Sequence, residues 1–329
     1  MSSDVRRIDR AELDAADATG ADVDLSVALA GVGLDNPILT ASGCAASGAE
    51  LDRFTDVTEL GAIVVKSITA EPRQGLPTPR MAETASGMLN AIGLQNPGVE
   101  AWIEQDLAWL RDRRARVVAS IAGRTPEEFR HVARRLAATG GDTVVALEVN
   151  LSCPNVEERG LVFACSPDAS AEVVRAVARE SSVPVLAKLT SDVTDVTAVA
   201  RAVAAAGADG VTLINTLLGM AIDPETGRPE LFNGYGGLSG PAIRPVALRN
   251  VHQVHQALPQ LPILGCGGVA DVTDVVQFLR AGASAVSVGT ATFVDPFVGP
   301  RLVADLRRWL GARGFGSVRE LIGAVRPWT

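Results

Sequence analysis

The stretch PVLAKLTSDVTDVTAVARAVAAAGADGVTLIN (184–215) contains an apolar run, a longer segment with helical spacing and a second apolar run. In the middle segment alanine and valine recur at helical intervals, and the segment ends near a glycine, as helices commonly do. The flanking runs, PVLAKL (184–189) and GVTLIN (210–215), are short and almost wholly apolar. Strands of this kind that alternate with helices belong to parallel sheets covered by helices. The stretch therefore predicts a strand, a crossover helix and a second strand parallel to the first.

The same pattern recurs along the chain. Six further apolar runs precede polar stretches and, in most cases, helix-like segments: PILTAS (37–42), AIVVKS (62–67), RVVASIAG (116–123), VVALEVNLS (144–152), PILGCGG (262–268) and AVSVGT (285–290). Eight units of this kind predict an α/β fold, a single (β/α)8 TIM barrel, which typically takes ~250 residues before insertions. An open, doubly wound sheet is the competing architecture. It is disfavoured because no GxGxxG motif follows the first strand.

Two segments precede the first barrel strand. Residues 1–22 are polar and acidic and contain no apolar stretch, so we expect a disordered tail and neither a signal peptide nor a membrane anchor. VDLSVALAGVGLDN (23–36) alternates like a short β-hairpin, which we expect to cap the bottom of the barrel. Residues 23–329 are then expected to form one barrel domain.

The composition excludes several classes of function. The 329 residues are 47% hydrophobic and carry a formal net charge of −8, with arginines scattered along the chain, so we expect no nucleic-acid partner. The four cysteines have no CxxC spacing, which disfavours a metal site and a disulfide framework. Reduced cysteines, with no membrane segment expected, fit a cytoplasmic protein.

Lysine is almost absent although arginine is common. Of the 30 lysine and arginine residues only Lys66 and Lys188 are lysines, and each lies at the end of a strand-like run. The two residue types are nearly equivalent on a solvated surface, so a drift toward arginine should leave lysine only where arginine cannot serve. A compact ammonium on a flexible stem fits a confined site and adjusts its pKa, whereas a planar guanidinium does not. We therefore expect both lysines to be functional; chance survival is the alternative.

In a barrel of this type the active site lies at the C-terminal ends of the strands. The residues expected there are small, amide-bearing or cationic: Ala41, Ser42, Gly43, Lys66, Ser67, Asn150, Lys188, Asn215, Thr216, Gly267, Gly268, Gly289 and Thr290. Glycines after the last two strands let backbone N–H groups approach a phosphate, and the helices that follow direct their positive ends toward it. The pattern predicts a phosphate-bearing ligand.

The same set indicates a class of chemistry. Two lysines and several amides, without an acidic pair, suit an anionic cofactor and an anionic substrate, whereas glycoside hydrolysis or a Ser-His-Asp mechanism needs residues that these strand ends lack. The candidate base is Cys153 in NLSCPN (150–155), where Pro154 favours an extended backbone and Asn150 and Asn155 flank the thiol. An inert thiol is the alternative for Cys153. It is our expectation for three other cysteines, namely Cys44, Cys165 and Cys266.

Seven motifs together resemble the dihydroorotate dehydrogenase family, from about Asp24 to the C-terminus. They occur in the family's order, and each falls where the barrel places a strand end or its following loop: NPILTASG (36–43), KSITAEPRQGLPTPRMAETASGMLNAIGLQNPG (66–98), LEVNLSCPN (147–155), INTLLG (214–219), GGLSGPAIRP (236–245), GCGGV (265–269) and SVGTA (287–291).

The resemblance implies an FMN enzyme that oxidises (S)-dihydroorotate to orotate in de novo pyrimidine biosynthesis. It implies that Cys153 is the general base at C5 while hydride leaves C6 for flavin N5, with Lys66 between flavin and substrate. The implied substrate-binding residues are Lys66, Asn90, Ile92, Gly93, Leu94, Asn150, Asn155, Asn215 and Thr216. The implied FMN-binding residues, which would make residues 23–329 an FMN-binding barrel, are Ala41, Ser42, Gly43, Lys66, Ser67, Asn150, Lys188, Gly240, Gly267, Gly268, Gly289 and Thr290.

The resemblance is greatest to the soluble, NAD-linked branch. The membrane-linked, quinone-using branch has an N-terminal helical extension and a serine in place of Cys153, and the fumarate-linked branch matches RQGLPTPRMAET (73–84) and INTLLGMAID (214–223) less well. The NAD-linked branch implies a homodimer and a heterotetramer with a subunit that carries FAD and an iron–sulfur cluster. One departure is Cys44-Ala45-Ala46, where the family usually has Thr-Phe-Gly, so this chain lacks an aromatic side chain near the flavin.

Other functions stay open on the sequence. A fumarate-linked enzyme, or a related FMN barrel that acts on another dihydropyrimidine, would carry much the same residues. Lys188 at a mid-barrel strand end is also a candidate Schiff-base lysine of an aldolase-like lyase. A flavin-binding scaffold without catalysis is the last alternative, although a scaffold has no use for the base Cys153.

Overall fold

The computed structural model describes residues 23–151 and 163–326. Its centre is an eight-stranded parallel sheet with the order β3-β14-β13-β10-β9-β8-β7-β4. A parallel bridge between Leu39 and Ala62 joins the two edges, so the sheet closes on itself. The strands, all within runs predicted above, are β3 (Ile38–Thr40), β4 (Ile63–Val64), β7 (Val117–Ile121), β8 (Val144–Asn150), β9 (Val185–Leu189), β10 (Gly210–Leu213), β13 (Ile263–Cys266) and β14 (Ala285–Val288). The prediction of a (β/α)8 barrel is confirmed.

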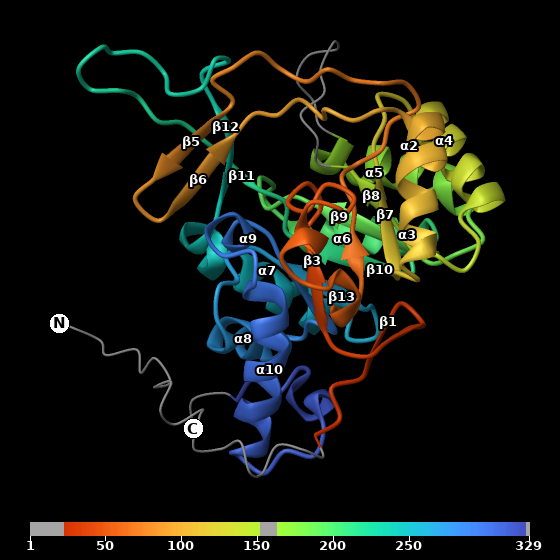
Figure 1. Ribbon diagram of the computed structural model, residues 1–329, viewed down its shortest axis with the longest axis vertical. Coiled ribbons are helices and arrows are strands. Elements are labelled where there is room, and N and C mark those ends of the chain that lie inside the picture. Colours follow the sequence, from red (N-terminus) through yellow and green to blue (C-terminus); the bar gives the residue numbers. More distant parts are fainter. Residues whose placement is uncertain (1–22, 152–162, 327–329) are drawn as a thin grey trace.

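The main helices surround this barrel (Figure 1). They are α4 (Pro126–Thr139), α5 (Pro167–Ala178), α6 (Val196–Ala205), α7 (Arg244–Ala257), α8 (Val272–Ala281) and α10 (Val298–Gly311). Shorter helical segments connect them: η1 (Leu51–Arg53), η2 (Val57–Glu59), α2 (Val99–Trp102), the π-helix η3 (Ile103–Leu107), α3 (Ala108–Asp112), η4 (Phe163–Cys165), η5 (Pro241–Ile243), α9 (Ala291–Val294) and η6 (Val318–Leu321). In the described ranges no helix is both long and apolar enough to cross a membrane.

Helix α6 shows how the sequence determines a crossover unit. The side chain of Asp195 accepts hydrogen bonds from the backbone N–H groups of Thr197 and Ala198, which satisfies two otherwise unpaired donors at the helix start. The apolar residues recur on one face, and Val199 and Val203 on that face are buried against the barrel. The helix therefore begins at its cap and connects β9 to the parallel strand β10.

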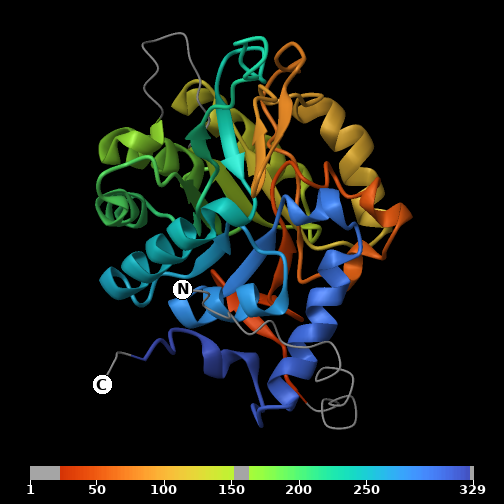
Figure 2. The same cartoon turned by 90° about the vertical axis from the view of Figure 1, so that its left-hand side faces the viewer.

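The predicted N-terminal hairpin is present and consists of β1 (Val27–Leu29) and β2 (Val32–Leu34). Its turn residues Ala30 and Gly31 have φ angles of 51° and 82°, as a two-residue hairpin turn that follows the strand twist requires. The chain passes from β2 into the beginning of β3, so the hairpin lies at the N-terminal ends of the barrel strands, the lower end in Figure 2.

A second sheet was not predicted. It is antiparallel, with the order β11-β12-β6-β5, and consists of β5 (Met81–Thr84), β6 (Gly87–Asn90), β11 (Leu217–Gly219) and β12 (Gly236–Ser239). These strands are short, glycine-rich and half-buried, so they lack the apolar run that reveals a barrel strand. They come from insertions after β4 and after β10, at the C-terminal ends of strands, and they stand above the barrel in Figure 2.

Candidate active site

A continuous set of hydrogen bonds connects polar side chains at the C-terminal ends of the strands. Ser42 Oγ lies 3.4 Å from Ser67 Oγ, and Asn150 Nδ2 donates to Ser67 Oγ at 3.1 Å. Asn215 Nδ2 in turn donates to Asn150 Oδ1 at 3.3 Å, and the backbone N–H of Thr216 donates to Asn215 Oδ1 at 2.8 Å. Five residues predicted for the site, from four parts of the barrel, therefore meet in one network.

Lys66 lies beside this network. A Cβ atom built on Gly43 would be 3.3 Å from Lys66 Nζ, so the lysine side chain reaches over the glycine that follows β3. Gly43 has a φ angle of 86°, which most other residues avoid. The glycine thus allows both the sharp turn after the strand and the close approach of the ammonium group.

The inserted sheet brings Asn90 to the same place. Asn90 Nδ2 donates to the backbone oxygen of Gly237 at 3.3 Å, and the two residues face each other across β6 and β12. A Cβ atom on Gly237 would overlap the hydroxyl of Thr216. Gly237 therefore lies between Asn90 and Thr216, and a larger residue in its place would collide with Thr216.

The loop after β6 contains Ile92, Gly93 and Leu94. The Ile92 carbonyl accepts a hydrogen bond from Leu76, and Gly93 has a φ angle of 73°. Leu94 has a φ of 56°, uncommon for a residue with a side chain, and its carbonyl accepts from Asn96 Nδ2 at 2.7 Å. Backbone held in such regions clusters at functional sites, so this loop is a candidate wall of the pocket.

Glycines form a second cluster at the ends of β13 and β14. A Cβ atom on Gly268 would lie 2.8 Å from the carbonyl oxygen of Gly240, and one on Gly240 would lie 3.4 Å from Thr290 Cγ2. Thr290 Oγ1 donates to Ser239 Oγ at 2.8 Å. Gly267 completes the turn with a φ of 131°. The glycines carry no side chains of their own here, so their backbone is accessible beside hydroxyl groups, which fits a phosphate group.

Gly289 connects this cluster to the end of β3. A Cβ atom on Gly289 would lie 3.3 Å from Ala41 Cβ and 3.4 Å from Cys44 Sγ. Burial, with a smaller contribution from Cys266, raises the pKa of the Cys44 thiol to about 11, although Lys188 and Lys66 oppose the increase. Cys44 is therefore a neutral thiol at physiological pH and a poor nucleophile.

Lys188 is buried inside the barrel beside a carboxylate. Its Nζ lies 3.4 Å from Glu148 Oε1, and Thr212 Oγ1 donates to Glu148 Oε2 at 3.0 Å. Burial by itself would lower the pKa of Lys188, but Glu148 with the thiols Cys266 and Cys44 raises it above the ordinary value of 10.5. The pair's contribution to folding stability is therefore complete below pH 10.5 and is lost as pH rises through the higher folded-state pKa.

Several residues of the site were missed in the sequence. Ser120 Oγ lies 3.0 Å from Ser67 Oγ. Ser239 contacts Thr290, and Gly237 lies against Thr216. The strongest overlooked signal was Glu148, because a charged residue inside an apolar run must be paired when the strand is buried. Two predicted residues, Cys153 and Asn155, lie outside the described residues, so the structure does not place them.

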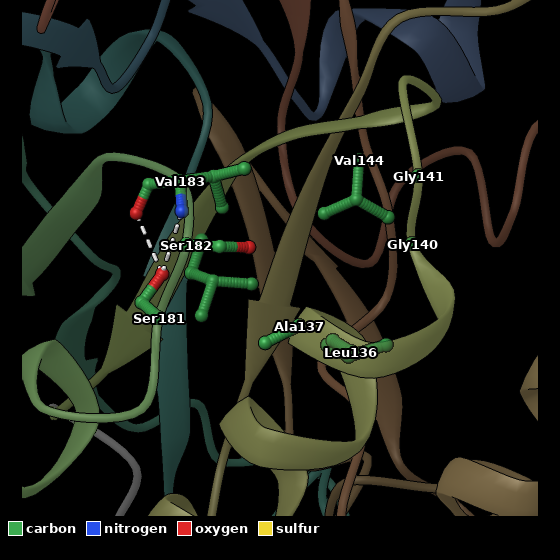
Figure 3. A pocket seen from close by; sticks show the side chains of 9 residues that line it. Leu136, Ala137, Gly140, Gly141, Val144, Ser181, Ser182 and Val183 are labelled. Atoms are coloured by element: carbon green, nitrogen blue, oxygen red, sulfur yellow. Dashed lines mark hydrogen bonds between the residues drawn. The ribbon is translucent and has the colours of Figure 1, made fainter.

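One small hollow lies away from this site. It measures about 80 Å³ and is lined by residues of α4, the start of β8 and the segment before β9. Figure 3 shows Val144 on one side and Ser181 and Val183 on the other, with the Ser181 hydroxyl bonded to the backbone of Val183. These are the N-terminal ends of strands, where barrel enzymes do not place their chemistry.

The family model for dihydroorotate dehydrogenase matches residues 24–310. The chain belongs to the dihydroorotate dehydrogenase family. Dihydroorotate dehydrogenases are oxidoreductases, and the barrel and glycine cluster described above suit the flavin that the family implies.

Curated relatives indicate the branch of dihydroorotate dehydrogenase. Proteins named dihydroorotate dehydrogenase B (NAD(+)), catalytic subunit, are similar: that of Geobacillus kaustophilus is 53% identical over 92% of this chain and 96% of its own length. The Bacillus caldolyticus protein is 52% identical over the same shares, and a Listeria monocytogenes protein is 49% identical over 90% and 97%. The predicted resemblance to the NAD-linked branch is confirmed.

Solved structures of dihydroorotate dehydrogenase share the fold. The Eimeria tenella enzyme in complex with ferulenol has a TM-score of 0.78 at 23% identity, over 98% of this chain and 91% of that chain. Its ligand-free form has the same TM-score and identity, over 96% and 98%. At this identity the likeness supports the barrel architecture alone.

Proposed function

We propose that this chain oxidises (S)-dihydroorotate to orotate in pyrimidine biosynthesis. The observation that carries the proposal is the hydrogen-bonded set from Ser42 to Thr216, which lies beside a glycine cluster at the mouth of one barrel. Amides present both donors and acceptors, as the edge of a pyrimidine requires, and an analogue without those edges would leave polar groups unsatisfied at ~1–3 kcal/mol each.

The side chains of this chain have distinct roles in the proposed reaction. Asn90, Asn150, Asn155, Asn215 and Thr216 hold the pyrimidine ring and its carboxylate, against the wall formed by residues 92–94. Cys153 removes the proton from C5 of the substrate. FMN, when bound, accepts the hydride from C6. Lys66 would place its positive charge between flavin and substrate, where it would stabilise the anionic substrate.

The residues proposed to hold FMN fit its parts. The cluster around Gly240, Gly268 and Thr290, with Gly267 and Gly289, would hold the phosphate, because glycines let the backbone approach it closely. Ala41, Ser42 and Gly43 would line the ring system, with Ser67 and Asn150 at its edge. Lys188 would face the polar edge of the flavin, where a cation would stabilise the electron-rich ring.

An anaerobic visible spectrum of the purified chain tests the proposal. The protein should be yellow, and dihydroorotate should bleach the flavin band in the absence of any partner, because the half-reaction needs only this subunit. A colourless protein, or a flavin band that dihydroorotate leaves unchanged while dithionite bleaches it, would contradict the proposal.

The electrons are proposed to leave through a second subunit. The relatives are named as catalytic subunits of NAD-linked enzymes, and the cysteines of this chain are not spaced for an iron–sulfur cluster. We propose a homodimer of this chain, assembled in the cytoplasm into a heterotetramer with an FAD and iron–sulfur subunit. Reoxidation of the isolated, reduced chain by fumarate would instead favour the fumarate-linked alternative.

The Schiff-base alternative is disfavoured. A lysine nucleophile must lose its proton, and the carboxylate of Glu148 next to Lys188 favours the ammonium form. The raised pKa of Lys188 points the same way. Borohydride trapping with a carbonyl substrate should therefore leave Lys188 unmodified.

Gly237→Ala should weaken substrate binding while leaving FMN bound. The new methyl group would displace the hydroxyl of Thr216 and disturb its neighbour Asn90, so the KM for dihydroorotate should rise by at least about fivefold. Steady-state kinetics with an artificial acceptor measure this. Gly33→Ala, in β2 and with open space around the Cβ position, is the control and should behave as wild type. An unchanged KM for dihydroorotate in Gly237→Ala would contradict a role for Thr216 in substrate binding.

A further inference from the structure

The barrel interior beneath Asn150 carries a layer of polar side chains. Strand register pairs Ser120 with Glu148, Asn150 with Lys188, and Lys188 with Thr212. Paired residues in neighbouring strands lie on the same face of a sheet, and residues two apart in one strand share that face. Because Asn150 reaches the network at the mouth, all of these side chains point into the barrel, where aliphatic residues usually dominate.

Glu148 is the centre of this layer. One carboxylate oxygen contacts Lys188 Nζ at 3.4 Å and the other accepts from Thr212 Oγ1 at 3.0 Å. The side chains of Glu148 and Lys188 are 1% and 6% exposed, so both charges have given up their water. A buried charge is tolerated only when it is paired and hydrogen-bonded. The geometry restrains Lys188 from below, on the side away from the barrel mouth.

We propose that Glu148 is a positioning residue for the flavin site. Its carboxylate keeps the ammonium of Lys188 charged and holds it in place toward bound FMN. This inference rests on the proposed function in one respect, namely that the ligand near Lys188 is FMN. The contact between Glu148 and Lys188 does not depend on it.

The groups around Lys188 explain why a carboxylate is needed. Glu148 faces it from β8, Cys266 from the end of β13 and Cys44 from the segment after β3. Burial raises the pKa of Cys44 to about 11, so this thiol brings no charge at neutral pH. Lys66, near Cys44, is a second cation. If Glu148 loses its charge, the carboxylate no longer offsets desolvation, which is the largest single effect on this ammonium, and the pKa of Lys188 falls.

The small number of lysines allows a direct measurement. In protein labelled with ¹³C at lysine Cε, only Lys66 and Lys188 give signals, and Lys188→Met assigns them. In the wild type the Lys188 signal should keep its ammonium shift up to pH 10.5. In Glu148→Gln it should titrate with a midpoint at least about one pH unit lower. Equal midpoints in the two proteins would overturn the proposal.

Two further variants keep this test decisive. Glu148→Asp retains the carboxylate but moves it one methylene away from Lys188 Nζ, so the midpoint of Lys188 in this variant should lie between those in the wild type and in Glu148→Gln. If Glu148→Gln does not fold, Glu148→Asp replaces it, and a wild-type midpoint in Glu148→Asp then overturns the proposal. Glu100→Gln removes a carboxylate from an exposed pair with Arg135 and is the matched control. It should leave the Lys188 signal unchanged, because exposed pairs are weakly coupled to the interior.

FMN binding gives a second readout. We compare the dissociation constant of FMN in Glu148→Gln with that in the wild type. The ratio of the two constants should rise about tenfold as the pH rises through the lowered midpoint of Lys188 in the variant, because the uncharged lysine loses its charge-assisted hydrogen bond to FMN. In the Lys188→Met background the same substitution should change binding by less than about twofold, because Glu148 acts through Lys188. A ratio independent of pH would overturn the positioning role. A wild-type chain that binds no FMN would contradict the proposed function and leave the lysine titration intact.

Discussion

Replacing Cys153 by alanine should leave FMN bound and yet slow the reduction of the flavin by dihydroorotate by about 10²–10⁴-fold at neutral pH, the usual contribution of a general base. Cys153 follows Asn150 by three residues, and Asn150 is fixed by hydrogen bonds to Ser67 and Asn215. The proposed base is therefore close in the chain to two of the proposed substrate-binding amides, Asn150 and Asn155. Stopped-flow absorbance under anaerobic conditions measures the rate directly.

Two controls separate the base from a structural thiol. Cys165→Ala removes an exposed cysteine that lies in η4, and it should reduce at the wild-type rate. Cys153→Ser should recover part of the activity only at higher pH, because a hydroxyl gives up its proton far less readily than a thiol. Rapid reduction of the alanine variant at neutral pH would refute the assignment of Cys153 as the base.

Replacing Gly268 by alanine should yield a folded protein that does not retain FMN. The added Cβ would lie 2.8 Å from the carbonyl oxygen of Gly240 and from the Cβ of Arg244, so the backbone of the proposed phosphate site must open. Gly268 also has a φ of 76°, where a side chain costs ~1–2 kcal/mol. The flavin-to-protein absorbance ratio after gel filtration should fall to a small fraction of the wild-type value.

Gly314→Ala is a closely matched control. Gly314 has a φ of 74°, so alanine meets nearly the same backbone strain, but no heavy atom of the described chain lies within 4 Å of the new Cβ. Gly314→Ala should lose only the stability that the backbone strain costs and keep its flavin, whereas Gly268→Ala, which adds the clash with Gly240 and Arg244, should lose more stability in thermal unfolding of the apoprotein. Loss of flavin from both variants, or from neither, would contradict a phosphate site at Gly268.

The barrel could be predicted because each strand leaves a local signal. Buried parallel strands need apolar residues on both faces, and the runs from 37–42 to 285–290 show that requirement one after another. Ser42, Ser67, Asn150 and Asn215 lie at the ends of these runs and could therefore be predicted for the site. Their meeting in one network follows from the closure of the barrel.

Other features depend on contacts between distant segments and left no local signal. The inserted sheet pairs β6 with β12, although Asn90 and Gly237 are 147 residues apart in the chain. Glycine-rich strands of three or four residues look like turns when they are read alone. The partner of Glu148 could not be named either, because strand register decides which lysine a buried carboxylate meets.

The ion pair inside the barrel bears on how far this fold can be divided. Glu148 belongs to the fourth barrel strand along the chain and Lys188 to the fifth, so a cut into two equal half-barrels would separate the two charges. Each half would then bury an uncompensated charge or leave its interior open to water. The other junction between the halves, where β14 pairs with β3, has no such pair, because neither strand contains a charged residue. The two halves of this barrel are therefore chemically complementary and not interchangeable.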